Sequence, residues 1–485
     1  MAVKMSFNSW DFLLFFPTAF FLYYALPHRL RWQLLLAASC IFYMAFIPYY
    51  IAILFATIIV DYIAGILISR SQGITKEIYL YCSVIVTCLI LFFFKYFDFV
   101  ALNINWLSKT FGMGYEANLL GIILPIGLSF HTFQSLSYVV EVYRGKQQPE
   151  KHFGIYSLYV LFFPQMVAGP IERPQNMLHQ FHKKIHFDYE KVKSGAMLLA
   201  FGLFKKIVIA DRLGEYVDLV FKAPENYDAA SIALALIFFY FQIYCDFSGY
   251  TDIARGSARM LGFELMKNFN VPFIADSLTN FWKRWHISLS TWLRDYIYEP
   301  LAMVMRYQGI YGIGLALLMT FFISGLWHGA KWTFIVWGLF NGAILLWEFL
   351  LGVYGKKRQI LPSWIGKPLA IIRTFSLICI SYIFFRSDSM SSALLMLKKL
   401  FVFPMQFTLE KIYQIPLPHN YFVISVWLII FLVVVELLNQ HGWLLKYYKR
   451  LPKIVQIVVC QAFLVCLIWY GYWFKGHTSF IYFQF

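Results

Sequence analysis

Residues 454–474 read "IVQIVVCQAFLVCLIWYGYWF", a stretch without a single Asp, Glu, Lys or Arg. A helix rises 1.5 Å per residue, so this stretch is long enough to cross the roughly 30 Å hydrocarbon core of a bilayer. A helix also satisfies its own backbone hydrogen bonds, which a chain in lipid requires. The stretch therefore predicts a transmembrane helix.

The composition extends this conclusion to the whole chain. Its 485 residues are 60% hydrophobic and only 14% charged, whereas soluble domains carry about 25% charged residues. Because the first run follows Asp11 and has no cleavage site, it is predicted to be a retained helix and not a signal peptide. We expect an all-α polytopic membrane protein with about 11–13 transmembrane helices, forming one domain over residues 1–485. The apolar runs lie near 12–26, 34–69 (two passes), 78–94, 119–142, 154–169, 196–210, 229–247, 310–326, 332–352, 371–385, 421–438 and 454–474.

The net charge of +16 comes from 41 basic and 25 acidic residues. The basic residues gather in short loops between apolar runs, the pattern of the positive-inside rule, so we predict no nucleic-acid partner. The last of these loops is cytoplasmic by this rule, which places the terminal "FIYFQF" outside. The seven cysteines are isolated, and we predict neither a disulfide framework nor a metal site. The loops are 70–76, 144–151, 183–193, 356–373 and 446–453.

The segment 246–299 differs from the rest, because it is too polar for a simple span and too aromatic for a solvated loop. Such sequence is tolerated at membrane depth only where it is buried in protein or lines a wet cavity. We predict short re-entrant or interfacial helices around a polar cavity. If the segment is helical, His286, Ser290 and Arg294 share one face. The alternative is an interfacial helix whose Lys283 and Arg284 reach the surface.

His328 ends a strongly apolar run in "FFISGLWHGAKWTF". An ionisable residue at such a position is a functional candidate, and imidazole exchanges a proton near neutral pH. Gly325 and Gly329 flank it at GxxxG spacing, which permits close approach of a helix or a substrate. The alternative is a histidine that hydrogen-bonds between helices.

Six motifs in order resemble the membrane-bound O-acyltransferase superfamily, in particular its bacterial alginate and peptidoglycan O-acetyltransferase branch. They are "PIGLSFHTFQSLSYVVEVYRG", "LFFPQMVAGPIERPQ", "YCDFSGYTDIARG", "NFWKRWHISLSTWLRDYIYEPL", "SGLWHGAKWTFIVWG" and "FIYFQF". The resemblance runs from near residue 7 to the C-terminus. It departs after "YIYEPL", where Ala302 and Met303 stand in place of a Gly-Gly pair.

This resemblance implies a helical bundle around a central tunnel that meets His328, with His286 as the second family histidine. It implies transfer of acetyl from cytoplasmic acetyl-CoA, a substrate and not a bound cofactor, to an extracytoplasmic polysaccharide such as alginate or peptidoglycan. The location implied is the bacterial cytoplasmic (inner) membrane, with a periplasmic or membrane-anchored partner protein. In the related D-alanylation system a similar F-x-Y-x-F tail bears an acyl-carrying tyrosine, which makes Tyr482 a candidate carrier. The alternative is an aromatic anchor at the outer interface.

We expect His328 to act as general base on the Tyr482 hydroxyl, with His286 or Ser290 stabilising the oxyanion. Lys205, Lys206 and Arg212 are candidates for contacting the phosphates of CoA. The residues expected to line the substrate path are Trp327, Ser290, Arg294, Asp246 and Gln134.

Three other functions compete with this interpretation. The first is transfer of D-alanine or another acyl group from a carrier-protein thioester. The second is a transporter or polysaccharide channel, which would be expected to show repeated halves and broken helices in matching positions, and the sequence shows neither. The third is a structural scaffold, which the costly polar segment 246–299 disfavours.

Overall fold

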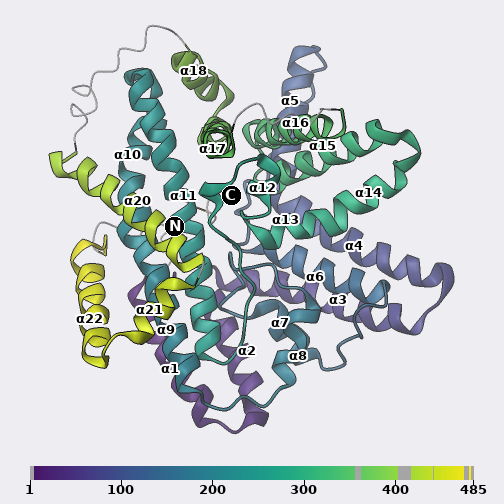
Figure 1. Cartoon of the computed structure of the whole chain (residues 1–485). Helices are drawn as coiled ribbons and strands as arrows, with labels where there is room; N and C mark the ends of the chain where they lie inside the picture. Colours follow the sequence, from purple (N-terminus) through teal and green to yellow (C-terminus); the bar gives the residue numbers. More distant parts are fainter. Residues whose placement is uncertain (1–4, 355–361, 402–416, 441, 474–479, 482–485) are drawn as a thin grey trace. The chain divides into compact units, whose positions relative to one another are not determined.

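The computed structural model describes residues 5–354, 362–401, 417–440, 442–473 and 480–481. Over these ranges the chain folds into helices and loops without a β-strand, which confirms the all-α prediction (Figure 1). The helices form two compact units. The first contains residues up to Leu199 and Tyr250–Met266, and the second contains Ala200–Gly249 and Lys267–Ile481. The prediction of one membrane domain stays a prediction.

The first unit is built on the N-terminal helices. Within it α3 packs against α4 and α6, and α2 packs against α7. A short 3₁₀ turn, Pro48–Tyr50, separates α2 from α3, so the apolar run 34–69 is two helices as predicted. The helices are α1 (Trp10–Ala25), α2 (His28–Met44), α3 (Ile51–Arg70), α4 (Gly73–Lys95), α5 (Phe97–Thr110), α6 (Leu128–Tyr143), α7 (Phe153–Leu161) and α8 (Pro174–His182).

Two helices, α9 (Tyr189–Leu203) and α11 (Ala229–Met260), contribute residues to both units. After α9 the chain continues without a break into η2 (Phe204–Ala210), a π-helical turn, and then into the rest of the second unit. Within this unit α15 lies along α16, and α16 packs against α17 (Figure 1). The remaining helices are α10 (Asp211–Lys222), α12 (Leu278–Trp282), α13 (Ile287–Leu293), α14 (Glu299–Val304), α15 (Gly309–His328), α16 (Trp332–Tyr354), α17 (Ser363–Arg386), α18 (Met390–Phe401), α20 (His419–Gln440), α21 (Trp443–Arg450) and α22 (Lys453–Tyr470).

Eight helices in the described ranges are long and apolar enough to cross a membrane, and α1 is a shorter apolar helix. This multi-pass architecture confirms the membrane fold, but the number is below the dozen runs counted by hydropathy. Two runs explain part of the difference. The run 154–169 forms only the nine-residue α7. The run 196–210 passes from α9 into the π-helical turn, where Lys205 and Lys206 are buried.

The segment 246–299 also differs from the prediction in its first part. Residues 246–260 belong to α11, a continuous helix of 32 residues. In its apolar 18-residue stretch, 83% of the residues are buried. Polar residues persist in this helix because protein surrounds them, as the physics of membrane interiors requires. From residue 261 the individual helices are short, as predicted: α12 has five residues, and α13 continues through the π-helical residues Arg294–Tyr298 directly into α14.

Candidate active site

His328 is the last residue of α15 and is buried. The next residue, Gly329, has an extended backbone (φ −174°), and it ends the helix there. Aromatic rings surround the imidazole: the centroids of Trp327 and Trp337 lie 4.9 Å from it, and that of Phe385 lies 5.2 Å away. Aromatic rings from α15, α16 and α17 therefore enclose the His328 side chain.

Glycines bring α15 and α16 together beside this histidine. A Cβ built on Gly325 would lie 2.4 Å from the carbonyl oxygen of Phe334, and one on Gly338 would lie 2.3 Å from that of Phe321. Neither distance is compatible with a side chain, so the two backbones touch at these positions. The GxxxG spacing around His328 thus serves helix packing, one of the two roles predicted for it.

His286 precedes α13 and does not belong to it. Its backbone is left-handed (φ 44°, ψ 53°), an uncommon conformation for a residue other than glycine. The expectation that His286, Ser290 and Arg294 share a helical face is therefore wrong. His286 is 1% exposed, whereas the Arg294 side chain is 57% exposed and pairs with the carboxylate of Asp295 at 2.7 Å.

Asn268 holds this unusual turn in place. Its carbonyl oxygen accepts a hydrogen bond from the N–H of Ile287 (2.9 Å), and its side-chain oxygen accepts one from the N–H of Ser288 (3.0 Å). Both donors belong to the first turn of α13, which has no capping side chain of its own. Sequence reasoning missed Asn268, whose only signal is a polar residue in "MKNFNVPF".

The two histidines meet at Trp327. The ring of Trp327 lies 6.0 Å from that of His286 and 4.9 Å from that of His328, centroid to centroid. Phe247 of α11 contacts His286 from another direction at 4.6 Å. Burial lowers the pKa of His286 to about 3, so its ring is neutral at physiological pH. A neutral imidazole has one N–H to donate and one nitrogen to accept.

Asp246, the residue before Phe247, belongs to a buried cluster of charged side chains. The ammonium of Lys206 contacts Oδ1 of Asp246 at 2.7 Å and Oδ1 of Asp211 at 2.8 Å, and all three side chains are buried. Lys205 is buried too and lies 3.5 Å from the carboxylate of Glu436. The suggestion that Lys205 and Lys206 contact CoA phosphates is wrong, because both are enclosed and paired with carboxylates.

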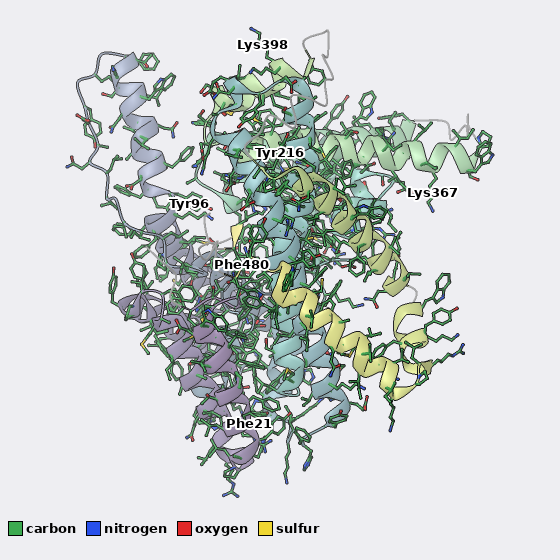
Figure 2. The ribbon with its side chains drawn as sticks, turned by 90° about the vertical axis from the view of Figure 1, so that its left-hand side faces the viewer. Phe21, Tyr96, Tyr216, Lys367, Lys398 and Phe480 are labelled. Carbon is green, nitrogen blue, oxygen red and sulfur yellow. The ribbon has the colours of Figure 1, made fainter. Side chains whose placement is uncertain are left out.

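The C-terminal segment docks on this cluster. The N–H of Ile481 donates to Oδ2 of Asp246 at 2.9 Å, and the Lys206 ammonium lies 4.5 Å from the ring centroid of Phe480. Phe480, labelled in Figure 2, is 1% exposed. An anchor at the membrane interface would leave such side chains accessible, and Phe480 and Ile481 are buried instead. Tyr482 lies outside the described residues.

The other predicted lining residues occupy different environments. Trp327 contacts both histidines, and Asp246 binds the tail. The Ser290 hydroxyl donates to the carbonyl of Trp285 at 3.1 Å. Gln134 belongs to the first unit, where its amide donates to the carbonyl of Tyr159 at 2.6 Å.

Two buried polar groups on α16 have no hydrogen-bond partner in the described part of the chain. They are the indole N–H of Trp337, whose ring contacts His328, and the hydroxyl of Thr333. Buried polar groups are nearly always paired, so unpaired ones mark a place for a ligand or water. Sequence reasoning had singled out neither residue. Over the described ranges, no cluster of three or more His, Cys, Asp or Glu side chains is arranged to bind a metal ion.

Comparison with known proteins identifies the family. Residues 152–385 match the model of the membrane-bound O-acyltransferase family. Over 407 residues, the chain is 36% identical to the probable alginate O-acetylase AlgI of Pseudomonas aeruginosa, covering 82% of this chain and 75% of the relative. The chain belongs to the membrane-bound O-acyltransferase family.

Two further relatives show which acyl groups occur among similar proteins. This acyltransferase is 33% identical over 416 residues to the peptidoglycan O-acetyltransferase of Helicobacter pylori, covering 79% of this chain and 77% of the relative. It is 29% identical over 277 residues to the teichoic acid D-alanyltransferase of Bacillus subtilis, covering 54% of this chain and 69% of the relative. The family and these names establish an acyltransferase, in place of the channel and scaffold alternatives.

Proposed function

We propose that this acyltransferase moves an acetyl group from cytoplasmic acetyl-CoA to a hydroxyl of an extracytoplasmic polysaccharide, using Tyr482 as a carrier. The acceptor is alginate, peptidoglycan or a similar glycan, reached through a periplasmic or membrane-anchored partner at the bacterial cytoplasmic membrane. Similarity to O-acetylating relatives over about four-fifths of the chain supports acetyl as the group transferred.

One observation carries the carrier role. Ile481 is hydrogen-bonded to Asp246, and the residue after Asp246, Phe247, contacts the ring of His286. Tyr482 is the next residue of the sequence after Ile481. A tail that served only as an anchor at the membrane interface would lie among lipid headgroups and would not bring its backbone N–H to a buried carboxylate. Docking of the tail on Asp246, whose neighbour in sequence contacts His286, supports a role for its tyrosine in the reaction.

In the first step the Tyr482 oxygen attacks the thioester carbonyl of acetyl-CoA. His328 takes the phenolic proton, and a tetrahedral oxyanion forms. When it collapses, the C–S bond breaks, and the CoA thiolate leaves and takes up the proton from His328. The products are O-acetyl-Tyr482 and CoA. A phenol, with a pKa near 10, is much easier to deprotonate than a sugar hydroxyl or water.

In the second step a sugar hydroxyl attacks the aryl ester. A new C–O bond forms, the bond to the tyrosine oxygen breaks, and the phenol regains its proton. The aryl ester is the more activated ester, so transfer to the sugar runs downhill. The oxyanion of either step needs a donor in a water-poor site. The indole N–H of Trp337 beside His328 and an N–H of neutral His286 are the candidates for that role.

Transfer of D-alanine from a carrier-protein thioester is the second candidate, favoured by the similarity to the teichoic acid D-alanyltransferase. The same steps apply, because the donor is again a thioester. The lower coverage, 54% of this chain, makes it the weaker candidate.

Mass spectrometry of the C-terminal peptide tests the proposal. Purified full-length protein is incubated with isotopically labelled acetyl-CoA, in wild type, His328→Ala and Tyr482→Phe forms. Label on Tyr482 in wild type alone is the expected result. CoA release without label on Tyr482 would remove the carrier from the scheme and leave direct transfer. The second candidate would be established if acetyl-CoA gave neither CoA release nor label on Tyr482, and a carrier protein charged with labelled D-alanine did label Tyr482.

A further inference from the structure

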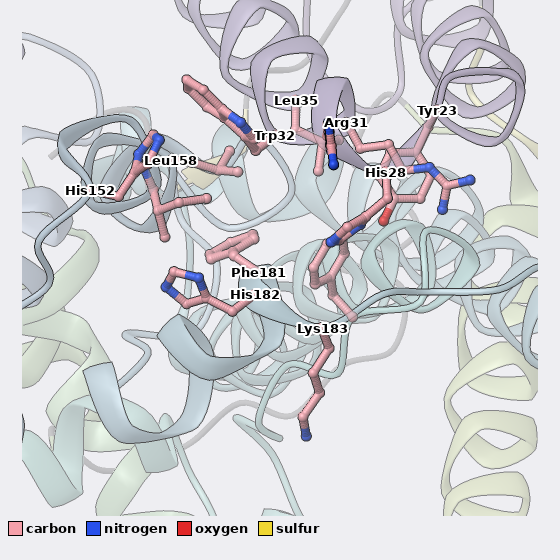
Figure 3. Close-up of a pocket in the computed structure, with 13 residues that line it drawn as sticks. Tyr23, His28, Arg31, Trp32, Leu35, His152, Leu158, Phe181, His182 and Lys183 are labelled. Atoms are coloured by element: carbon pink, nitrogen blue, oxygen red, sulfur yellow. The ribbon is translucent and has the colours of Figure 1, made fainter.

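A second site lies in the first unit, far in sequence from both histidines. A pocket of about 380 Å³ opens where the turn between α1 and α2 meets α7 and the end of α8. Figure 3 shows His152 and His182 at one end of it and Tyr23 and His28 at the other, with Phe181 between them. Its volume lies in the range of small-molecule sites.

The lining of this pocket is strongly basic. Arg29, Arg31 and Lys183 contribute to it, and the lining as the structure describes it includes no Asp or Glu. Two carboxylates lie outside the lining: Oε2 of Glu150 is 2.7 Å from Nε2 of His182, and Asp188 acts electrostatically on Tyr24, whose ring contacts Arg31. The three basic side chains of the lining outnumber these two negative charges.

Arg31 is a cation held in place by carbonyl groups, and within the described residues no carboxylate forms an ion pair with it. Its Nε donates to the carbonyl of Leu26 at 3.0 Å, and its Nη1 donates to the carbonyl of Ile185 at 2.6 Å. Its guanidinium also lies 4.9 Å from the ring centroid of Tyr23. Carbonyls and a ring orient the charge but do not neutralise it, so its field acts on the pocket.

The floor of the pocket is apolar. Leu35, Leu158 and Phe181 line it and are buried. An ordinary solvated basic loop would have no such floor. The combination fits a ligand with an anionic head and an apolar body, as basic pockets between helices do when they bind lipid headgroups.

We propose that this pocket binds a phosphate ester whose remaining part packs on the apolar floor. Arg29 and Lys183 donate to the phosphate oxygens, Arg31 supplies a fixed positive potential, and the apolar floor holds the remainder of the ligand. Binding of a phospholipid here would be additional to the acyl transfer proposed above, whereas binding of CoA would rest on that proposed function. Lys183 begins one of the loops that the positive-inside rule assigns to the cytoplasm, where both sources of such a ligand occur. These sources are an anionic phospholipid and the phosphates of CoA.

Native mass spectrometry of the full-length protein in detergent tests the site. The protein is titrated separately with dioleoylphosphatidylglycerol, with zwitterionic dioleoylphosphatidylcholine and with coenzyme A. The test variant is Arg29→Gln combined with Lys183→Gln, because both residues are exposed and their loss leaves the fold intact. Arg31 is left unchanged, since its hydrogen bonds to three carbonyls support the chain. The matched control is Arg70→Gln combined with Lys184→Gln, which removes the same two charges from exposed positions outside the lining.

We expect the test variant to bind the anionic ligand about tenfold to thirtyfold more weakly than wild type, at about 1 kcal/mol for each basic residue lost. The control should change binding less than threefold. Loss for phosphatidylglycerol assigns the pocket to a lipid, and loss for coenzyme A assigns it to the donor's phosphates. Arg29→Lys should retain most of the binding. Equal weakening in test and control variants, or no preference for either anionic ligand over phosphatidylcholine, would overturn the proposal.

Discussion

The backbone N–H of Ile481 donates a 2.9 Å hydrogen bond to the carboxylate of Asp246, which lies 235 residues earlier in the chain. Asp246 is at the same time bound to Lys206. Through this pair of contacts the end of the chain is fixed to the helix that carries Phe247, the neighbour of His286.

Replacing Asp246 therefore should release the tail. Asp246→Ala removes the acceptor of the Ile481 N–H, and losing a charge-assisted hydrogen bond of about 1.5–3 kcal/mol should lower labelling of the C-terminal peptide by about 10–100-fold. Asp246→Asn keeps an acceptor oxygen and should lose less. The exposed Asp388 provides the control through Asp388→Ala. Equal labelling in Asp246→Ala and wild type would show that the docking contact does not serve the reaction.

Lys206 should matter for stability more than any surface lysine. Lys206→Met leaves the carboxylates of Asp211 and Asp246 buried without their shared cation, which should cost about 3–5 kcal/mol of unfolding free energy. Thermal unfolding in detergent, followed by tryptophan fluorescence, measures this. Lys398→Met at an exposed position should leave the transition where it is. If both variants unfold alike, the cluster is not a stabilising element.

His328→Ala should reduce acyl transfer by about 10²–10⁴-fold, the range for a positioned general base. CoA release from acetyl-CoA, read with a thiol reagent, gives the rate. His186→Ala at an exposed loop position is the matched control. A loss below about fivefold, with normal protein stability, would rule out His328 as the base.

Gly325 should tolerate no side chain. Gly325→Ala drives a methyl group against the Phe334 carbonyl at 2.4 Å, so α15 and α16 must separate, at about 1–3 kcal/mol. Activity should fall as well, because His328 is the last residue of α15. Gly352→Ala is the control on α16, since its Cβ would meet nothing within 4 Å. Unfolding temperatures that match for the two variants would contradict the close approach.

His286 combines a chemical and a conformational role, and two substitutions separate them. Asn accepts a left-handed backbone, so His286→Asn should keep the fold and lose activity. His286→Val should lose stability in addition, by about 1–2 kcal/mol, because β-branched residues are strained there. Unfolding free energy and CoA release are measured side by side, and equal stability of the two variants would exclude backbone strain at this position.

The same histidine should make the protein sensitive to acid. Burial lowers the pKa of His286 to about 3, whereas the unfolded chain takes up a proton below about pH 6.5. Its stability contribution is therefore complete above pH 6.5 and is lost as the pH falls toward 3. Stability measured across that window should decline less in His286→Asn than in wild type. Parallel pH profiles would show that the ring is not held neutral.

The membrane fold was within reach of the sequence, because hydropathy is a local signal, and the position of His328 at the end of an apolar run marks it as a candidate in the same local way. The surroundings of the two histidines could not be predicted from the sequence. Asn268, Trp337 and the Lys206 cluster act through contacts between distant segments that no spacing rule encodes. Arg294 shows the limit most clearly, since one left-handed residue, His286, cancels the helical register on which its prediction depended.

The two residues of the contact between Asp246 and Ile481 are synthesised at different times. A ribosome adding about 5–20 residues per second needs roughly 12–47 s to travel the 235 residues from the first to the second. Throughout that interval α11 exists without the donor that its carboxylate later receives. The contact therefore forms only after the 235 residues that separate its two partners have been made, so the carboxylate of Asp246 waits for its backbone donor during synthesis.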